Sequence, residues 1–275
     1  MQLQIQPLIA SKMNFSVGTS FKNCQTGFTL VEMAMVLMIV ALLLGGLLPT
    51  ISSQVEQRHE NDTRKQLDEI QQALIGYAII NGRLPCPATS GSTPPGTENP
   101  AGGGNCATFT PNTNGYVPAA TLGLSGATSS GLVLDSWGNP IRYAVTNATA
   151  TVTGFNGGST FNVFTFPGGI SAVGISKISP NLLVCSSSTA SGFSPGVSCG
   201  ANNALTSSPG VPVVLFSTGK DGPQGGGADE LANLANKLTF ISHTPTPSPN
   251  QFNDIVIWLS PNILVNRMVS AGKLP

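Results

Sequence analysis

An almost uninterrupted apolar run near the start of the chain constrains its fold more than any other feature. Residues 28–48 read FTLVEMAMVLMIVALLLGGLL and contain one charged side chain, Glu32. As a helix rising about 1.5 Å per residue, this run would span about 31 Å, close to the thickness of a bilayer core. A buried helix of a soluble protein is the alternative, but such helices are usually shorter. The run therefore predicts a transmembrane helix over residues 28–48.

The residues before the run predict its orientation. Residues 1–27 contain Lys12 and Lys22 and no acidic side chain. Basic residues ahead of a first span favour keeping that side in the cytoplasm. A cleaved secretory signal is the alternative, but Gly45 to Pro49, which end the run, make a poor A-x-A-like cleavage site. We therefore expect a single-pass protein with its head on the outward side, which for a bacterial protein means an anchor in the inner membrane and a head in the periplasm.

The helix is expected to continue past the membrane with a different pattern. Pro49 interrupts the apolar run, and beyond it the sequence becomes amphipathic. Four apolar side chains recur at intervals of three and four residues and so share one helical face: Leu67, Ile70, Leu74 and Tyr77. Gly82 ends the pattern. We predict one helix over residues 28–82, amphipathic over 49–82, with its stripe facing a head formed by residues 83–275.

The overall charge limits the functions open to this chain. Only 9% of the residues are charged, and 12 Lys and Arg balance 12 Asp and Glu, so the formal net charge is zero. A protein that binds nucleic acid usually has a basic excess for the phosphate backbone. The composition therefore argues against a nucleic-acid partner.

The sequence of the head predicts a mixture of short strands and short helices. Five β-branched or aromatic runs are candidate strands: residues 141–146, 160–166, 212–217, 238–242 and 254–259. Residues 229–237 and 261–271 are expected to be helices, the second with Ser260 as N-cap and Pro261 at its first position. This order predicts an α+β fold in which a long helix precedes a mostly antiparallel sheet.

The cysteines indicate disulfides rather than a metal centre. Cys24 lies in the segment before the apolar run, which leaves four cysteines in the head: Cys86, Cys106, Cys185 and Cys199. In an exported protein, four cysteines suggest two disulfides with three possible pairings. The local pairings, 86 with 106 and 185 with 199, are favoured because each would close a loop poor in apolar anchors. The chain has no C-x-x-C and only two histidines, so a zinc site is disfavoured.

The start of the apolar run resembles a known family. G-F-T-L-V-E at residues 27–32, followed by the apolar span and Pro49, is similar to the N-terminus of type IV pilins and type II secretion pseudopilins. The resemblance implies that prepilin peptidase cleaves after Gly27 and methylates the new amino terminus, Phe28. It also implies that Glu32 pairs with the amino terminus of a neighbouring subunit during assembly.

Two segments of the head extend this resemblance to pseudopilins. DSWGNPIRY at residues 135–143 is similar to a turn and strand of the major pseudopilins, and we expect it to be a structural turn that leads into a strand. Residues 217–229 and 254–258 are similar to their calcium-binding loop. The resemblance implies possible calcium ligands: Ser217, Asp221 and Asp254, with Asp229 in reserve. A plain solvated turn is the alternative.

The apparent catalytic motif of the chain fails on chemical grounds. GFSPG at residues 192–196 matches G-x-S-x-G, but Pro195 has no backbone N–H to donate to an oxyanion. We therefore expect no enzymatic activity. The predicted function is a prepilin-like structural subunit, with a membrane-tethered binding or adhesin module that does not polymerise as the alternative.

Overall fold

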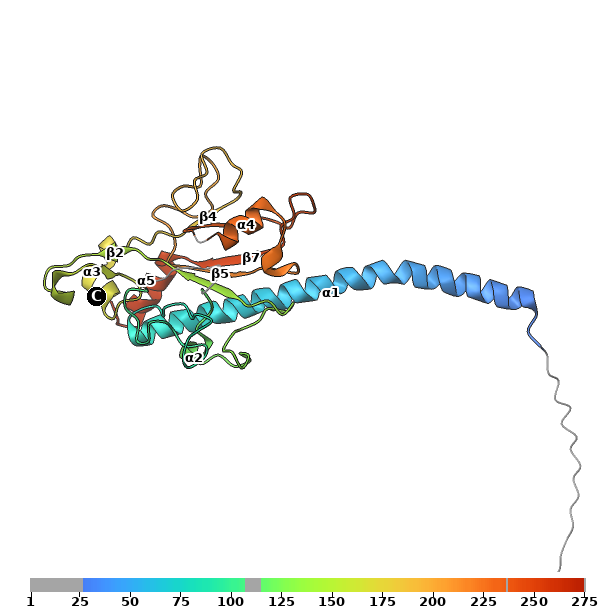
Figure 1. The fold of residues 1–275 in the computed structure, drawn as a ribbon, viewed down its shortest axis with the longest axis horizontal. Coiled ribbons are helices and arrows are strands. Elements are labelled where there is room, and N and C mark those ends of the chain that lie inside the picture. Colours follow the sequence, from blue (N-terminus) through green and yellow to red (C-terminus); the bar gives the residue numbers. More distant parts are fainter. Residues whose placement is uncertain (1–26, 107–114, 236, 275) are drawn as a thin grey trace, which may run out of the picture. The chain divides into compact units, whose positions relative to one another are not determined.

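The computed structural model describes residues 27–106, 115–235 and 237–274 (Figure 1). Within the first helix, the side chains of residues 44–52 lie outside this description. Pro49, which the resemblance links to assembly, is one of these residues. The predicted leader also lies outside the described residues, apart from Gly27. The chain divides into two units at Ser52, and each unit is considered by itself.

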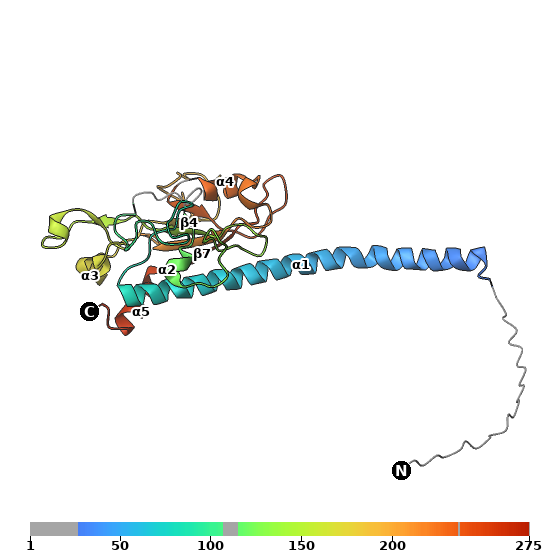
Figure 2. The ribbon, with the colours of Figure 1, turned by 60° about the horizontal axis from the view of Figure 1, so that its bottom comes forward.

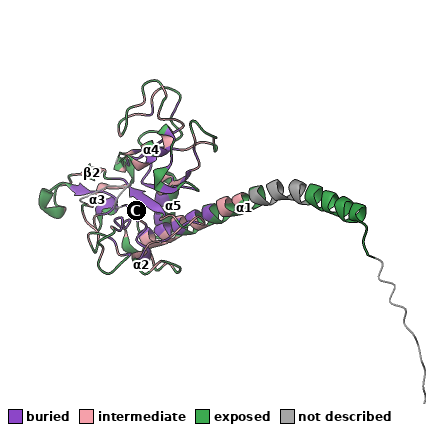
Figure 3. Ribbon diagram, turned by 45° about the vertical axis from the view of Figure 1, so that its right-hand side comes forward, coloured by how far each residue is buried: buried purple, intermediate pink, exposed green. Residues whose placement is uncertain are grey.

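Helix α1 runs from Leu30 to Asn81, which confirms the long N-terminal helix. In the first unit, every described side chain of this helix is exposed, as the green colour in Figure 3 shows for residues 30–43. A search of the described residues finds no helix with the length and hydropathy of a membrane span. Because the side chains of residues 44–48 lie outside the description, the transmembrane span over residues 28–48 stays a prediction.

In the second unit, α1 presents the predicted apolar stripe to the head. Leu67, Ile70 and Leu74 are buried, while Tyr77 is half-buried. The helix ends where Gly82 adopts a φ of +69° and donates its N–H to the carbonyl of Ala78. This left-handed conformation suits glycine, which has no Cβ atom to clash, and it stops the helix at the predicted position.

In the part of the head that the structure describes, three strands form an antiparallel sheet in the order β1-β5-β7. Its strands are β1 (Arg142–Val145), β5 (Val213–Ser217) and β7 (Ile255–Leu259). Two smaller sheets each contain two strands: the antiparallel pair β2 (Thr149–Ala150) and β3 (Phe161–Asn162), and the parallel pair β4 (Leu183–Cys185) and β6 (Thr239–Ile241). All five predicted runs therefore contain strand residues, whereas β2, β4 and the parallel pairing were not predicted.

Among the described residues of the head, four short α-helices accompany these strands: α2 (Ala119–Leu122), α3 (Gly169–Val173), α4 (Ala228–Leu234) and α5 (Pro261–Ser270). The two predicted short helices correspond to α4 and α5. Helix α5 begins at Pro261 after Ser260, as predicted, although the Ser260 side chain makes no capping hydrogen bond. Figure 2 shows α2 and α5 near the last turns of α1, and buried side chains of all three helices share one core cluster.

The central strand β5 separates two layers of core. Val213 and Leu215 pack in a cluster with the α1 stripe and with Leu264 and Met268 of α5. The alternate residues Val214 and Phe216 pack in a second cluster with side chains from β4 and β6. Successive side chains of a strand point to opposite faces, so β5 is buried on both sides and its sequence is a continuous apolar run.

Candidate functional site

The segment that begins α1 has its own hydrogen-bonded geometry. Thr29 immediately precedes the helix, and its backbone N–H and its hydroxyl each donate to Oε2 of Glu32 at 2.9 Å. In return, the backbone N–H of Glu32 donates to Oγ1 of Thr29 at 3.3 Å. This reciprocal arrangement is a capping box, which satisfies N–H groups that the first turn of a helix leaves without partners.

Thr29 is the residue of this segment that the sequence analysis missed. The signal was present, because T-L-V-E at residues 29–32 has the S/T-x-x-E spacing of a capping box. The cap gives Glu32 a partner within its own chain, so the carboxylate does not depend on a neighbouring molecule when the chain is alone. Any second partner for Glu32 would have to compete with Thr29 or share the carboxylate with it.

The helix that follows this cap exposes a continuous apolar surface. Phe28 and Leu30 are 81% and 87% exposed, and the large apolar side chains from Val31 to Leu43 are exposed as well. A soluble surface rarely carries an apolar patch of this extent unless it contacts lipid or another protein. Within the first unit, residues 30–43 therefore present an apolar helical surface that could contact lipid or another protein.

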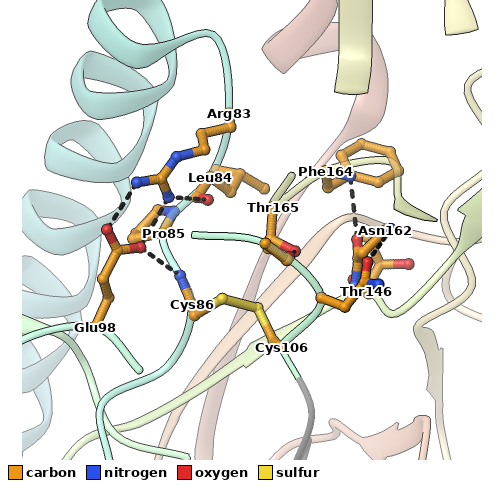
Figure 4. The surroundings of a disulfide bond; sticks show 12 residues. Arg83, Leu84, Pro85, Cys86, Glu98, Cys106, Thr146, Asn162, Phe164 and Thr165 are labelled. Atoms are coloured by element: carbon orange, nitrogen blue, oxygen red, sulfur yellow. Dashed lines mark hydrogen bonds and ion pairs between the residues drawn. A yellow bond between two sulfur atoms is a disulfide. The ribbon is translucent and has the colours of Figure 1, made fainter. Parts of the chain in front are cut away.

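The head begins with a disulfide beside a buried ion pair. Cys86 and Cys106 form one of the two predicted local disulfides, with an S–S distance of 2.05 Å. Figure 4 shows Glu98, from the loop that this disulfide closes, facing Arg83 just after α1. The guanidinium donates to both carboxylate oxygens, at 2.7 and 2.8 Å, and Cys86 donates its backbone N–H to Oε2. The loop is thereby fastened to the end of α1.

These contacts determine the direction in which the pKa of Glu98 is shifted. Burial opposes ionisation of this carboxyl, but the hydrogen bonds from Arg83 and Cys86 outweigh that cost and lower its pKa. The loop backbone lies against the guanidinium, because a Cβ atom at Gly103 would come within 2.6 Å of Cζ of Arg83. Since both charges are buried, each depends on the other for compensation.

The second disulfide, between Cys185 and Cys199, confirms the other local pairing, with an S–S distance of 2.08 Å. The loop that it closes contacts Asp229, which accepts the backbone N–H of Ser188 at 2.6 Å. His243 places Nε2 at 3.2 Å from Oδ2 of Asp229. Through these two contacts, Asp229 links its own helix, α4, to the second disulfide loop and to the segment after β6.

The structure gives the predicted calcium ligands separate partners. Ser217 donates its hydroxyl to Asp135, and Asp254 accepts from Nδ2 of Asn233 at 2.8 Å. Burial raises the pKa of Asp254 to about 8. Asp221 is exposed and accepts from Nδ2 of Asn253 at 2.7 Å. Among the described residues, no group of three or more His, Cys, Asp or Glu side chains is placed to hold a metal ion.

The pseudopilin-like segment at residues 135–143 forms the expected turn. Oδ1 of Asp135 accepts the backbone N–H groups of Trp137 and Asn139, at 3.0 and 2.8 Å. Trp137 is half-buried and packs against the main core cluster. The carboxylate thus closes a turn over the following residues and leads the chain into β1.

Comparison with protein families identifies the N-terminal segment. The family model of the prokaryotic N-terminal methylation motif matches residues 22–48. The chain therefore carries a prepilin-type cleavage and methylation motif, which implies a prepilin-like protein that prepilin peptidase processes and that is anchored in the inner membrane before assembly. Such proteins are generally structural subunits without enzymatic activity. The long helix followed by an α+β head is a pilin-like arrangement.

The match covers the motif and not the head. Searches of curated proteins and of solved structures find no match to this chain. The function of the head therefore has to be inferred from the contacts of its own residues.

Proposed function

We propose that this chain is a structural subunit of a type IV pilus or a type II secretion pseudopilus. Prepilin peptidase cleaves it between Gly27 and Phe28 and methylates Phe28. Its apolar helix then moves from the inner membrane into the core of a filament. The observation that carries this proposal is the exposed apolar face of residues 30–43, which lies within the methylation motif.

Glu32 supplies the register of this assembly. A carboxylate in an apolar environment is costly unless it has a partner. Cleavage after Gly27 creates a cationic amino group at Phe28, and the amino group of a neighbouring subunit is a suitable partner for Glu32. The two hydrogen bonds from Thr29 hold the carboxylate at the start of α1 until that partner arrives.

The choice between the two filament systems rests on the head. The Asp135 turn that leads into β1 is similar to a segment of the major pseudopilins, and this favours the secretion system. The two disulfides suit a head that works outside the reducing cytoplasm. Other pilin or pseudopilin subunits are then its partners, and the periplasm is where its head resides before assembly.

One observation favours the alternative of a tethered binding module. A cavity of about 480 Å³ lies between the second disulfide loop and the segment after β6, and this size suits a small-molecule ligand. Its lining includes the polar side chains of Ser187, Asp229, His243 and Asn250 beside Pro247 and Pro249. A binding head of this kind would require the membrane anchor but not polymerisation.

Mass spectrometry of the mature protein separates the two functions at the first step. A prepilin subunit has an N-methylated Phe28 as its first residue when it is produced with prepilin peptidase, and it keeps residues 1–27 when the peptidase is absent. An intact leader in both strains would contradict the proposal.

The second step is assembly. We expect Glu32→Val to enter the membrane as well as the wild type but to lose incorporation into filaments, measured by shearing and immunoblotting. Glu69→Gln, which changes an exposed acid elsewhere on α1, is the matched control and should assemble normally. Normal incorporation of Glu32→Val would contradict the role of Glu32.

A further inference from the structure

A cavity of about 480 Å³ in the head has walls from three separate segments of the chain. The second disulfide loop contributes Ser186, Ser187 and Thr189, and the first turn of α4 contributes Asp229. The third wall comes from the segment after β6, between residues 243 and 250. A cavity of this size is large enough for a small ligand.

The wall formed by the second disulfide loop is held in place by a buried amide. Asn203 is only 4% exposed, and its Nδ2 donates to the carbonyl oxygens of Cys199 at 2.6 Å and Ser187 at 2.7 Å. Its Oδ1 accepts the hydroxyl of Ser186. The disulfide between Cys185 and Cys199 closes the same loop. This wall is therefore formed before any ligand arrives, which lowers the entropic cost of binding.

The wall after β6 has an equally defined shape. The ring of His243 stacks on Phe252 with a centroid separation of 3.9 Å. Thr246 and Phe252 exchange two backbone hydrogen bonds of 3.0 Å, and the hydroxyl of Thr246 donates to the carbonyl of Asn250 at 2.6 Å. The short loop over residues 247–250 is thereby held against the cavity.

The charges of the lining disfavour an ionic ligand. None of the described residues that line the cavity is Lys or Arg, so neither basic residue is available to bind a phosphate or carboxylate ligand. Among the same residues, only Asp229 carries a carboxylate. This carboxylate already accepts the backbone N–H of Ser188 at 2.6 Å and lies 3.2 Å from Nε2 of His243. Because a cationic ligand would have to compete with these contacts, the lining favours a neutral ligand.

The remaining groups of the lining suit a ligand that is rich in hydroxyl groups. Serine and threonine hydroxyls and the asparagine amide can both donate and accept hydrogen bonds, and the cavity offers them at Ser187, Thr189, Ser248 and Asn250. The exposed side chains of Ser248 and Asn250 make no hydrogen bond to the described residues, so their capacity is available to a ligand. The ring of Pro249 adds apolar surface.

We propose that this cavity binds a neutral saccharide. A sugar alternates hydroxyl groups with C–H surface, so its hydroxyls can bond to Ser248 and Asn250 while its C–H face packs on Pro249. The proposal rests on the same cavity as the binding-module function and supplies its ligand class. It holds equally for the head of a filament subunit, because none of the described lining residues belongs to α1.

The test is binding of the full chain to an array of immobilised glycans. The protein is purified in a detergent without a sugar headgroup, so that the detergent does not compete for the cavity. We expect binding to neutral glycans that the free sugar displaces and that inorganic phosphate and spermidine do not. Isothermal titration calorimetry with the free sugar then gives the Kd. No binding to any neutral glycan on the array would overturn the proposal.

Variants place the bound sugar in the cavity. Asn250→Ala removes an exposed amide without a partner among the described residues, so the Tm should stay the same. The loss of one hydrogen bond to the sugar should weaken the Kd about fivefold. Asn266→Ala changes an exposed asparagine of α5 and is the matched control, which should bind like the wild type. If Asn250→Ala and Ser248→Ala both bound with the wild-type Kd, the sugar would not occupy this cavity.

The filament role is measured separately, by the methylation of Phe28 and by filament incorporation. A chain that is methylated and incorporated but binds no glycan would contradict the saccharide site alone. A chain that binds glycans but keeps its leader would contradict the filament role alone.

Discussion

The two stretches of α1 use apolar side chains for different purposes. In residues 30–43 every described side chain is exposed, although the stretch is almost wholly apolar. In residues 53–81 the apolar side chains of one helical face, which include Leu67, Ile70 and Leu74, are buried in the core of the head, although Val55 and Ile80 are exposed. Burial of apolar surface is the main favourable term in folding. The second stretch contributes this favourable free energy to the folding of its own head. The apolar surface of the first stretch remains available for lipid or for another protein.

This difference predicts which substitutions destabilise the head. Changes in the second stretch, or in residues that fasten its end, should lower the free energy of unfolding of the head. Changes in the first stretch should leave that free energy unchanged and alter membrane or filament contacts. Four predictions test this division, from the largest expected effect to the smallest.

The largest effect is expected at the end of the second stretch. Glu98→Ala would leave Arg83 buried without its partner, which costs about 3–5 kcal/mol in comparable cases. Chemical denaturation of the full chain in detergent measures this loss. Glu60→Ala is the control, because its pair with Arg64 is more exposed and should contribute less than about 1 kcal/mol. If both substitutions lowered the free energy of unfolding equally, burial would not be what makes the Arg83–Glu98 pair strong.

A matched pair of leucines compares the stretches directly. Leu74 is 0% exposed and Leu37 is 63% exposed. Leu74→Ala should destabilise the head by about 2–5 kcal/mol, because it removes packing and leaves a cavity. Leu37→Ala should change the unfolding of the head by less than about 0.5 kcal/mol. The same denaturation experiment serves for both, and a large loss for Leu37→Ala would show that the first stretch supports the head.

The Glu98 pair also predicts a pH dependence. Its pKa in the folded state lies below the ordinary value of 4.5. The stability that the pair contributes is therefore fully present above pH 4.5 and is lost as the pH falls through the lower folded value. Thermal unfolding between pH 7 and pH 3 should show a gap between the wild type and Glu98→Gln that narrows below pH 4.5. A constant gap would be inconsistent with this linkage.

The smallest effect on the head is expected at the start of the first stretch. Thr29→Ala removes the cap, which costs the helix about 1 kcal/mol locally. Hydrogen exchange of the first turn should accelerate, while the Tm of the head stays the same. Thr29→Ser retains the hydroxyl and should restore slow exchange. Unchanged exchange in Thr29→Ala would mean that the capping box contributes nothing measurable.

Features that depend on near neighbours were predictable from the sequence. The end of α1 at Gly82, the strands β5 and β7, and helix α5 after Ser260 all follow from local periodicity and turn chemistry. The two local disulfides follow from short spacing between cysteines. Even the missed cap at Thr29 was encoded in a four-residue spacing.

Features that join distant segments were not predictable in this way. Strand β4 is only three residues long, and its parallel partner β6 is far along the chain, so no alternation or hairpin turn signals the pairing. The pairing of Arg83 with Glu98 and the contact of Asp229 with His243 likewise leave no local pattern in the sequence.

The sequence by itself determined the methylation motif, the long helix with its two kinds of apolar surface, and the α+β character of the head. The tertiary structure alone decided which charges are paired in the head and which side chains are buried there. The physical reason is the separation along the sequence over which each kind of interaction acts. Helical periodicity and capping act over a few residues, whereas burial and charge pairing depend on segments that meet only when the chain folds.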